Sequence, residues 1–180
     1  MKSSAEIDET GKYRYSLIRE WRTRQYLTLL QLPDIMDRAC FIMLNPSTAD
    51  ARQDDPTIRR CISLAKAWGC GGIEVVNLFA YRATDPRELL RAADPVGPEN
   101  DKHIVRAAMG CQWVVAAWGT RGAFKGRDKQ VIQLIQEIRK PLYCVGLTKD
   151  GHPRHPLYAR RVPEPILFCQ EVSCSYGNAT

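Results

Sequence analysis

A short apolar run that stops abruptly in polar residues is the feature that most constrains the fold of this chain. Residues 40–44 read Cys-Phe-Ile-Met-Leu, and an apolar run without alternation predicts a strand buried on both faces. The proline at position 46 ends this strand, because it has no N–H group to donate to a sheet. Asp55 and Pro56 have the residue types of a helix N-cap and a first helical position. Residues 40–61 therefore predict a strand, a polar loop and a helix.

Three later apolar runs repeat this arrangement. They cover residues 73–79, 113–118 and 142–145. A short helix through Leu90 is expected after the cap Thr84-Asp85-Pro86, and further helices around residues 104–108 and at residues 129–139. Four buried strands that alternate with helices predict a parallel sheet with helices on both faces. We therefore expect one α/β domain over residues 1–180, a three-layer α/β/α sandwich with a central, mainly parallel four-stranded sheet.

Weaker patterns surround this predicted core. Residues 13–19 alternate imperfectly and predict an exposed N-terminal edge strand, with residues 24–30 either as its hairpin partner or as a short helix. Residues 166–169 predict one more edge strand. The polar segment 1–12 and the tail 170–180 are expected to be loose.

Cysteine usage and hydropathy narrow the class of protein. The seven cysteines form no C-x-x-C pair, and Cys40, Cys61 and Cys144 fall at predicted buried positions, as reduced core cysteines do. We therefore expect no metal site and no cofactor. No run approaches the roughly 18 apolar residues of a membrane span, and the N-terminus lacks the apolar centre of a signal peptide. These patterns predict a soluble, cytoplasmic protein with no membrane partner.

The positive charge is concentrated in one region. The chain carries a net charge of +6, and between Trp118 and Arg161 ten lysines and arginines face three acidic residues. An excess of this kind suits a polyanion, so the partner we expect is nucleic acid or a nucleotide. Many solvated protein surfaces have a similar composition, and that alternative stays open.

Polar or aromatic residues stand where each predicted buried strand ends. Asn45 follows the first strand, Asn77 lies near the end of the second, Trp118 ends the third, and the loop of residues 152–158 comes after the fourth. The carboxyl ends of parallel strands meet at one edge of a sheet, where ligands bind. We expect these residues to converge there. Each also has a structural explanation, since asparagine before proline forms turns and tryptophan packs in cores.

At these positions the chain resembles known proteins. It is identified as a member of a bacterial and phage family of proteins of unknown function by the motifs LNPSTAD, DDPTIRRC, NLFAYRATDP, AWG and RHPLY. More distantly, residues 40–160 resemble the uracil-DNA glycosylase superfamily. Residues 41–46 are similar to its first motif in the asparagine form, residues 75–78 to its base-reading strand, and residues 155–158 to the His-Pro motif of its minor-groove loop. The resemblance implies a uracil-DNA glycosylase-like fold and cleavage of a bond between base and sugar.

The chemistry that such a reaction needs can be assigned to particular residues. Asn45 can hold a water through its amide oxygen, although an amide is not a base. A neutral His155 can donate a hydrogen bond to a carbonyl of the departing base. Asn77 offers both a donor and an acceptor to an amide-like base edge. These three side chains must share one cleft for the interpretation to hold.

Further residues are candidates for binding. Phe79, Tyr81 or Trp118 can stack on a base, an interaction worth about 1–3 kcal/mol. Leu157 or Tyr158 can fill the gap that a flipped nucleotide leaves. The candidates for contact with the nucleic-acid backbone are Arg82, which can equally pair with Asp85, and Arg121, Lys125, Lys149 and Arg154.

Two departures from the superfamily leave alternatives open. The first motif carries no carboxylate, so Asp50 is assigned as the catalytic carboxylate, with Asp54 and Asp55 as alternatives. A second pair, His152-Pro153, precedes His155, and the sequence does not decide between the two histidines. We expect a nucleic-acid-directed N-glycosidic hydrolase that acts on a damaged or modified base, with DNA as its main partner. The alternatives are a non-catalytic binder of nucleic acid or nucleotides and an enzyme of free nucleosides, and the oligomeric state is left open.

Overall fold

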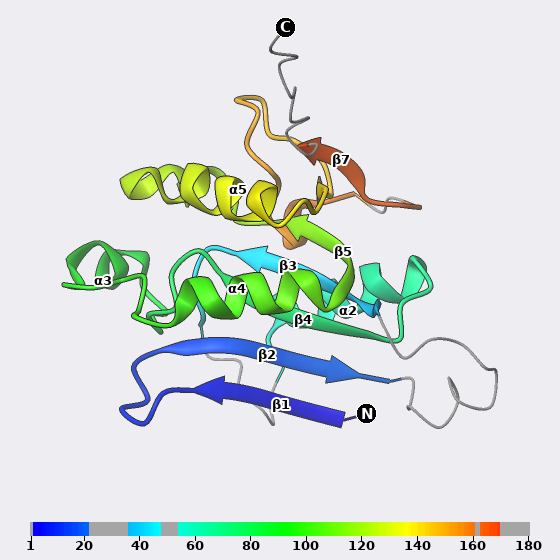
Figure 1. Ribbon diagram of the computed structural model, residues 1–180. Helices are drawn as coiled ribbons and strands as arrows, with labels where there is room; N and C mark the ends of the chain where they lie inside the picture. The colour runs from blue at the N-terminus through cyan, green and yellow to red at the C-terminus, as the bar shows by residue number, and fades with distance from the viewer. Residues whose placement is uncertain (1, 22–35, 48–53, 161–162, 170–180) are drawn as a thin grey trace, which may run out of the picture.

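A computed structural model describes residues 2–21, 36–47, 54–160 and 163–169 of the chain. Its centre is one mixed sheet of seven strands (Figure 1). Their spatial order is β1 (Lys2–Ile7), β2 (Arg14–Glu20), β4 (Gly72–Asn77), β3 (Met36–Met43), β5 (Cys111–Ala116), β6 (Leu142–Cys144) and β7 (Ile166–Cys169).

The four predicted buried strands are β3, β4, β5 and β6. β3 runs parallel to β4 on one side and to β5 on the other, and β5 runs parallel to β6. β1, β2 and β7 pair in antiparallel fashion. The sheet is therefore mixed and has seven strands: the predicted strands at residues 13–19 and 166–169 are present as β2 and β7, and β1 is an additional strand that was not predicted.

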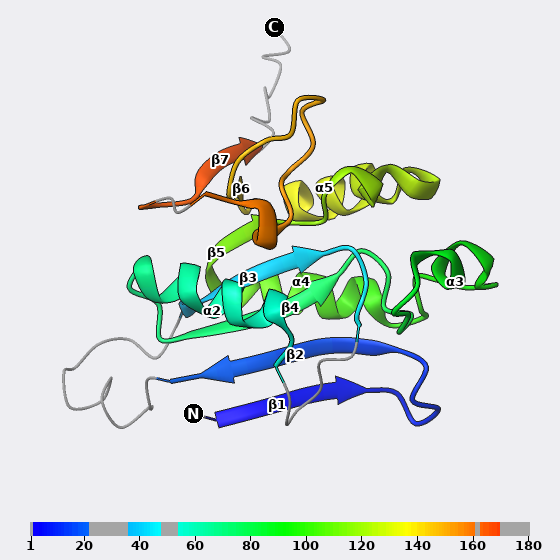
Figure 2. The same ribbon diagram turned by 180° about the vertical axis from the view of Figure 1, so that it is seen from behind.

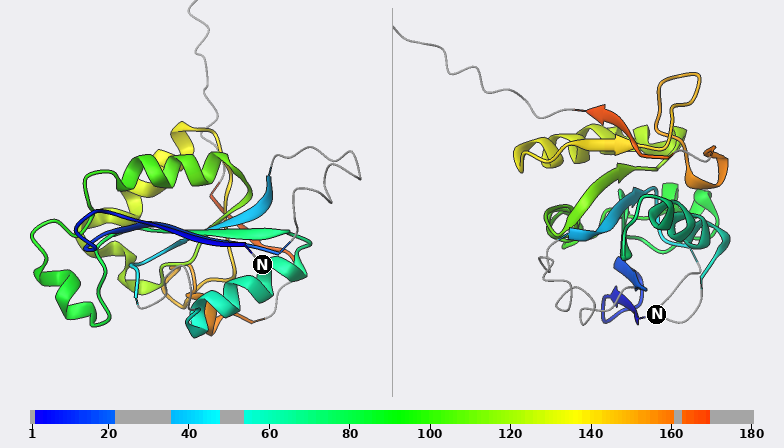
Figure 3. Two further views of the ribbon diagram at one scale, coloured as in Figure 1. Left: turned by 90° about the horizontal axis from the view of Figure 1, so that it is seen from below. Right: turned by 90° about the vertical axis from the view of Figure 1, so that its right-hand side faces the viewer.

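Helices cover both faces of the sheet. α2 (Pro56–Ala67) lies on one face, in front in Figure 2, and α4 (Asn100–Met109) and α5 (Arg127–Glu137) lie on the other, in front in Figure 1. The left view of Figure 3, along the sheet, shows α4 and α2 on opposite sides. Alternate residues of β3 enter two separate cores: Phe41 packs with Ile58 of α2, and Ile42 with Ile104 of α4 and Ile135 of α5. None of the helices in these described ranges is long and apolar enough to cross a membrane.

The predicted start of α2 is confirmed. The side chain of Asp55 accepts a hydrogen bond of 2.8 Å from the N–H of Ile58, and Pro56 takes the first helical position. Asp85 caps the short helix α3 (Pro86–Arg91) in the same way. Both caps were predicted because Asp-Pro combines a side-chain acceptor with a backbone angle already suited to a helix. They fix the points at which the loops after β3 and β4 end.

The N-terminal segment differs from expectation. Residues 2–7, predicted to be loose, form the edge strand β1, which pairs with β2. β2 is consequently an inner strand, because β4 pairs along its other side. β1 is exposed along most of its length, so its sequence carries no apolar alternation that would reveal a strand. The alternative partner, residues 24–30, lies outside the described residues.

Two buried polar side chains hold the carboxyl end of β4. The Nδ2 of Asn100 donates hydrogen bonds of 3.0 Å to the carbonyl oxygens of both Asn77 and Leu78. The Nε of Arg127 donates a bond of 2.9 Å to the same carbonyl of Leu78, and its guanidinium also pairs with Asp101. α4 and α5 therefore fix the backbone just where the strand ends.

This arrangement predicts a specific loss of stability. We expect Asn100→Ala to lower the free energy of unfolding by about 1–3 kcal/mol, because two buried carbonyl groups lose a fully buried donor. Lys102→Ala, on the exposed side of the same helix, is the control and should change it by less than about 0.5 kcal/mol. Equal effects of the two variants in urea denaturation would contradict the role assigned to Asn100.

Candidate functional site

A pocket of about 660 Å³ opens at the carboxyl ends of the parallel strands. It is called the main pocket below. The segments after β3, β4, β5 and β6 contribute to it, together with the start of α2 and Arg14 of β2. Asn45, Asn77 and His155, predicted to share one cleft, all line it. The carboxyl ends of strands that are far apart in the sequence thus form one cavity, as expected for parallel strands.

Asn45 presents an acceptor to the main pocket. Its Nδ2 donates to the carbonyl oxygens of Pro46, at 3.0 Å, and of Ala83, at 2.8 Å. These bonds fix the orientation of the amide and use its donor. The Oδ1 has no hydrogen bond within the described residues, so it remains able to accept one from a bound molecule.

Asn77 is buried in the wall of the main pocket with an unused donor. Its side chain is 1 % exposed, and its Nδ2 has no hydrogen-bond partner among the described residues. A buried polar group without a partner costs about 1–3 kcal/mol. The backbone clamp by Asn100 and Arg127 prevents the strand end from moving to relieve this cost. The amide therefore has a free donor fixed beside a cavity, as a ligand-binding group would.

His155 reaches the main pocket from the loop after β6. Its Nδ1 accepts a hydrogen bond of 3.4 Å from the N–H of Leu157, so in the neutral ring the proton is on Nε2. Burial lowers the pKa of His155 below its ordinary value of 6.5, and the negative charge of Asp55 opposes this shift. The ring is therefore a neutral donor at pH 7. His152, the other candidate in this loop, does not line the pocket.

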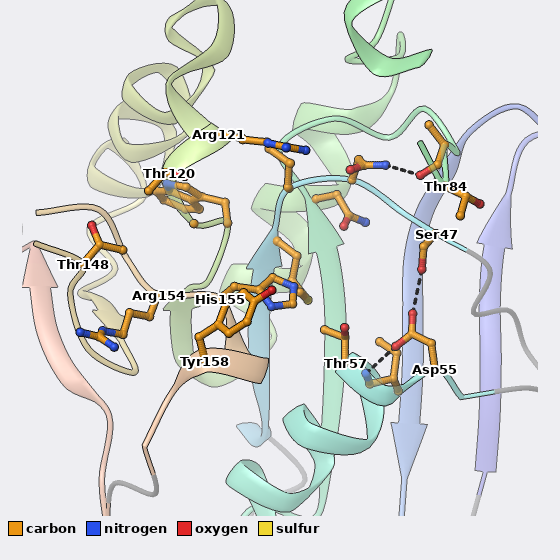
Figure 4. Close-up of a pocket in the computed structure, with 18 of the residues that line it drawn as sticks. Ser47, Asp55, Thr57, Thr84, Thr120, Arg121, Thr148, Arg154, His155 and Tyr158 are labelled. Atoms are coloured by element: carbon orange, nitrogen blue, oxygen red, sulfur yellow. Dashed lines mark hydrogen bonds between the residues drawn. The ribbon is translucent and has the colours of Figure 1, made fainter. Parts of the chain in front are cut away.

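Asp55 is both the N-cap of α2 and a residue of the main pocket. One carboxylate oxygen caps α2, and the other accepts a hydrogen bond of 2.8 Å from the hydroxyl of Ser47 (Figure 4). It is the one carboxylate among the described residues that line the main pocket. The predicted N-cap could have indicated this position, because a helix that follows a strand begins at the edge of the sheet where that strand ends. Asp50, predicted as the catalytic carboxylate, lies outside the described residues.

Cations and hydroxyl groups form much of the remaining lining. Arg121, Lys149 and Arg154, predicted to bind a nucleic-acid backbone, all line the main pocket, and so does Arg14, which is 3 % exposed. Arg14 was missed because it enters from β2, a strand far from the motifs in sequence. The hydroxyl groups come from Ser47 and from four threonines, Thr57 in the first turn of α2 and Thr84, Thr120 and Thr148 (Figure 4). Four positive charges against one carboxylate make the pocket suited to an anionic ligand.

The predicted stacking residues are separated by the structure. Trp118 lines the main pocket but is almost fully buried. Its ring packs directly against Gly122, where an added Cβ would lie only 2.0 Å from Cδ1. Phe79 is fully buried and packs on Phe124 at a ring distance of 5.6 Å. β4 ends at Asn77, and Phe79 follows it in the core between the sheet and the helices α4 and α5. Tyr81 packs edge-on against Tyr13, outside the pocket.

Several remaining candidates also lie outside the main pocket. Arg82 donates a hydrogen bond of 3.2 Å to the carbonyl of Gly11, and Lys125 lies over the ring of Phe124. A local contact accounts for Lys125, whereas the Nε of Arg82 is buried without a hydrogen-bond partner among the described residues. Of the two wedge candidates, Tyr158 lines the pocket with 75 % of its surface exposed, whereas Leu157 is exposed beside it. Within the described ranges no three His, Cys, Asp or Glu residues form a group that could hold a metal ion.

The environment of His155 predicts its titration. We expect NMR to give His155 a pKa below 6.5, and Asp55→Asn to lower it further, because the variant removes the charge that favours the imidazolium. Since the folded state then binds fewer protons than the unfolded state, stability should fall as the pH drops below 6.5. A pKa at or above 6.5, or one that rises in Asp55→Asn, would contradict the burial and contacts described.

Comparison with known proteins identifies the family and leaves its activity open. No curated protein and no solved structure matches the chain. Residues 14–157 match a family model described as "Protein of unknown function (DUF1643)". This match spans the strands and loops that form the main pocket, from β2 to the loop that carries His155. The chain therefore belongs to the family DUF1643.

Proposed function

We propose that the protein hydrolyses the N-glycosidic bond of a damaged or modified base in nucleic acid. The observation that carries the proposal is the buried amide of Asn77, whose free donor lines the same pocket as Asn45 and a neutral His155. A buried, fixed amide beside a cavity suits recognition of an amide-like edge, which both uracil-like and many modified bases carry. The basic lining suits the phosphates attached to such a base.

The residues of the main pocket can divide the reaction between them. Water attacks the anomeric carbon of the sugar, the carbon–nitrogen bond breaks, and its electron pair leaves with the base. Asn45 would orient the water through Oδ1, and Asp55 would stabilise the positive charge that develops on the sugar. His155 would donate from Nε2 to a carbonyl oxygen of the departing base, where negative charge accumulates. The proton lost by the water would pass to solvent or to the released base.

The arrangement of strands also supports this proposal. The parallel strands stand in the order β4, β3, β5, β6, with β3 in the centre and the three motifs at their carboxyl ends. The uracil-DNA glycosylase-like fold proposed from the sequence places its motifs on such strand ends. The seven-stranded mixed sheet adds edge strands to that arrangement.

Polymeric nucleic acid is a better candidate substrate than a free nucleoside. Leu157 and Tyr158 stand exposed beside the main pocket, with 46 % and 75 % of their surfaces accessible. Enzymes that extrude a nucleotide from a strand need side chains to fill the gap, whereas a free nucleoside leaves no gap. Lys149 and Arg154 lie in the same loop and would contact the adjoining phosphates.

A non-catalytic nucleic-acid binder is the second candidate. The observation that favours it is the amide at position 45, which can position a water but cannot remove its proton. The carboxylate of Asp55 already accepts from Ser47 and from the backbone of Ile58, which limits its capacity to act as a base. Under this alternative the main pocket would bind an extruded base without releasing it.

Base release from short single-stranded and duplex oligonucleotides that carry uracil, mismatches or modified bases tests the proposal. We expect strand scission at the resulting abasic site for at least one substrate. His155→Ala should lower the rate by about 10²–10³-fold, as loss of a donor to developing charge does. Asn45→Ala and Asp55→Asn should each lower it by at least about tenfold, and asparagine can still cap α2.

The control for these variants is His152→Ala. His152 is in the same loop, does not line the main pocket, and contacts Thr148 through its backbone, so its substitution should leave the rate unchanged. No scission of any substrate by a protein that still binds DNA would favour the non-catalytic binder. Unchanged rates in the Asn45 and His155 variants would exclude the assigned roles.

The salt dependence of oligonucleotide binding distinguishes a polymer ligand from a free nucleoside. The logarithm of affinity should fall with the logarithm of salt concentration, by about 0.9 for each phosphate contact on duplex DNA. Lys149→Gln should reduce this slope by about one contact, whereas Lys102→Gln, on α4, should leave it unchanged. An affinity that does not depend on salt would indicate a nucleoside-directed protein.

A further inference from the structure

A second, smaller cavity adjoins the main pocket and has no role in the reaction described. It is called the side pocket below, has a volume of about 310 Å³, and is lined by Leu44, Arg87, Leu89, Leu90, Arg121 and Phe124. Leu44 and Arg121 also line the main pocket, so the two cavities share a boundary. A ligand that fills the main pocket can therefore extend into the side pocket.

The lining of the side pocket combines apolar walls with positive charge at its margin. Leu89 is buried at its base, and Leu90 on α3 is 56 % exposed at its mouth. Phe124 closes it from the segment η1 (Thr120–Gly126). Apolar walls of this kind bind a flat, apolar surface, and the volume is at the lower end of the range for small-ligand pockets, about 300–1,000 Å³. The space suits one planar group.

Arg121 stands at the boundary between the two cavities. Its side chain is exposed and forms no hydrogen bond or ion pair with any residue of the described ranges. Figure 4 shows it along the margin of the main pocket, next to Thr120. A guanidinium group binds phosphate in a bidentate manner. Arg87, the other cation of the side pocket, is already paired with Asp85 at 3.0 Å. Arg121 is thus the cation available for a phosphate between the cavities.

We propose that the side pocket binds the base of a nucleotide adjacent to the one in the main pocket, with Arg121 on the phosphodiester that joins them. This inference rests on the proposed function, and it adds that the protein recognises two consecutive nucleotides. The adjacent base would stack against Leu90 and Phe124, and this contact can be made by any base because every base has a flat π-face. The site would therefore raise affinity for a strand over a free nucleotide without strong sequence preference.

Fluorescence anisotropy with short single-stranded oligonucleotides tests this inference on the full chain. The probe is the oligonucleotide of the base-release panel that binds most tightly, in three versions: unmodified, and with a tetrahydrofuran abasic residue on either side of the target base. We expect one of the two abasic versions to bind about tenfold more weakly, because it cannot fill the side pocket. Leu90→Ser should reduce that difference to less than about threefold.

Met109→Ser is the matched control, because Met109 is 58 % exposed on α4 and lines neither cavity. It should retain the full tenfold difference. Equal binding of all three versions, or a difference that Leu90→Ser leaves unchanged, would overturn the side pocket as a base-binding site. Asn77→Ala separates this failure from failure of the proposed function, since it should weaken all three versions if the main pocket binds the target base. If Asn77→Ala has no effect, or no oligonucleotide binds, both proposals are wrong.

Discussion

The end of β4 is held by hydrogen bonds from two buried side chains, and the geometry of the main pocket depends on this contact. Asn100 and Arg127 donate to the last carbonyl groups of the strand and of the residue after it. These bonds come from α4 and α5, so the helical layer on one face of the sheet fixes a side chain that faces the pocket. The backbone of Asn77 is held at the wall of the pocket, and the Nδ2 of its side chain has no hydrogen-bond partner among the described residues.

The electrostatic design of the main pocket follows from its position. Strand ends, a helix start and two loops meet there, and each brings short polar side chains that also cap or turn the backbone. Asp55 and Asn45 both serve the backbone with one part of the side chain and present another part to the cavity. The basic residues come from longer loops and from β2. The result is a basic cavity in which burial keeps one histidine neutral.

Three exposed apolar side chains lie around this region. Leu157 and Tyr158 flank the main pocket, and Leu90 stands at the mouth of the side pocket. In water each would be more favourable covered than exposed. A nucleic-acid strand offers base surfaces for these side chains and phosphates for the cations between them, which gives both proposals a common physical basis.

The sequence by itself determined the parts of this protein that depend on neighbouring residues. Unbroken apolar runs predicted β3 to β6, and Asp-Pro pairs predicted where α2 and α3 begin, because burial and capping are local preferences. The convergence of Asn45, Asn77 and His155 followed from the parallel order of the strands. Only the tertiary structure decided which side chains turn into the cavity. In the structure Arg14 and Asp55 line the main pocket, and Phe79 lies in the core. Of the two histidines, His155 lines the pocket and His152 does not. These choices depend on strand pairing and loop packing between distant segments, and no local pattern records them. The polar strand β1 likewise could not be predicted from its own residues, because its pairing with β2 is what makes it a strand.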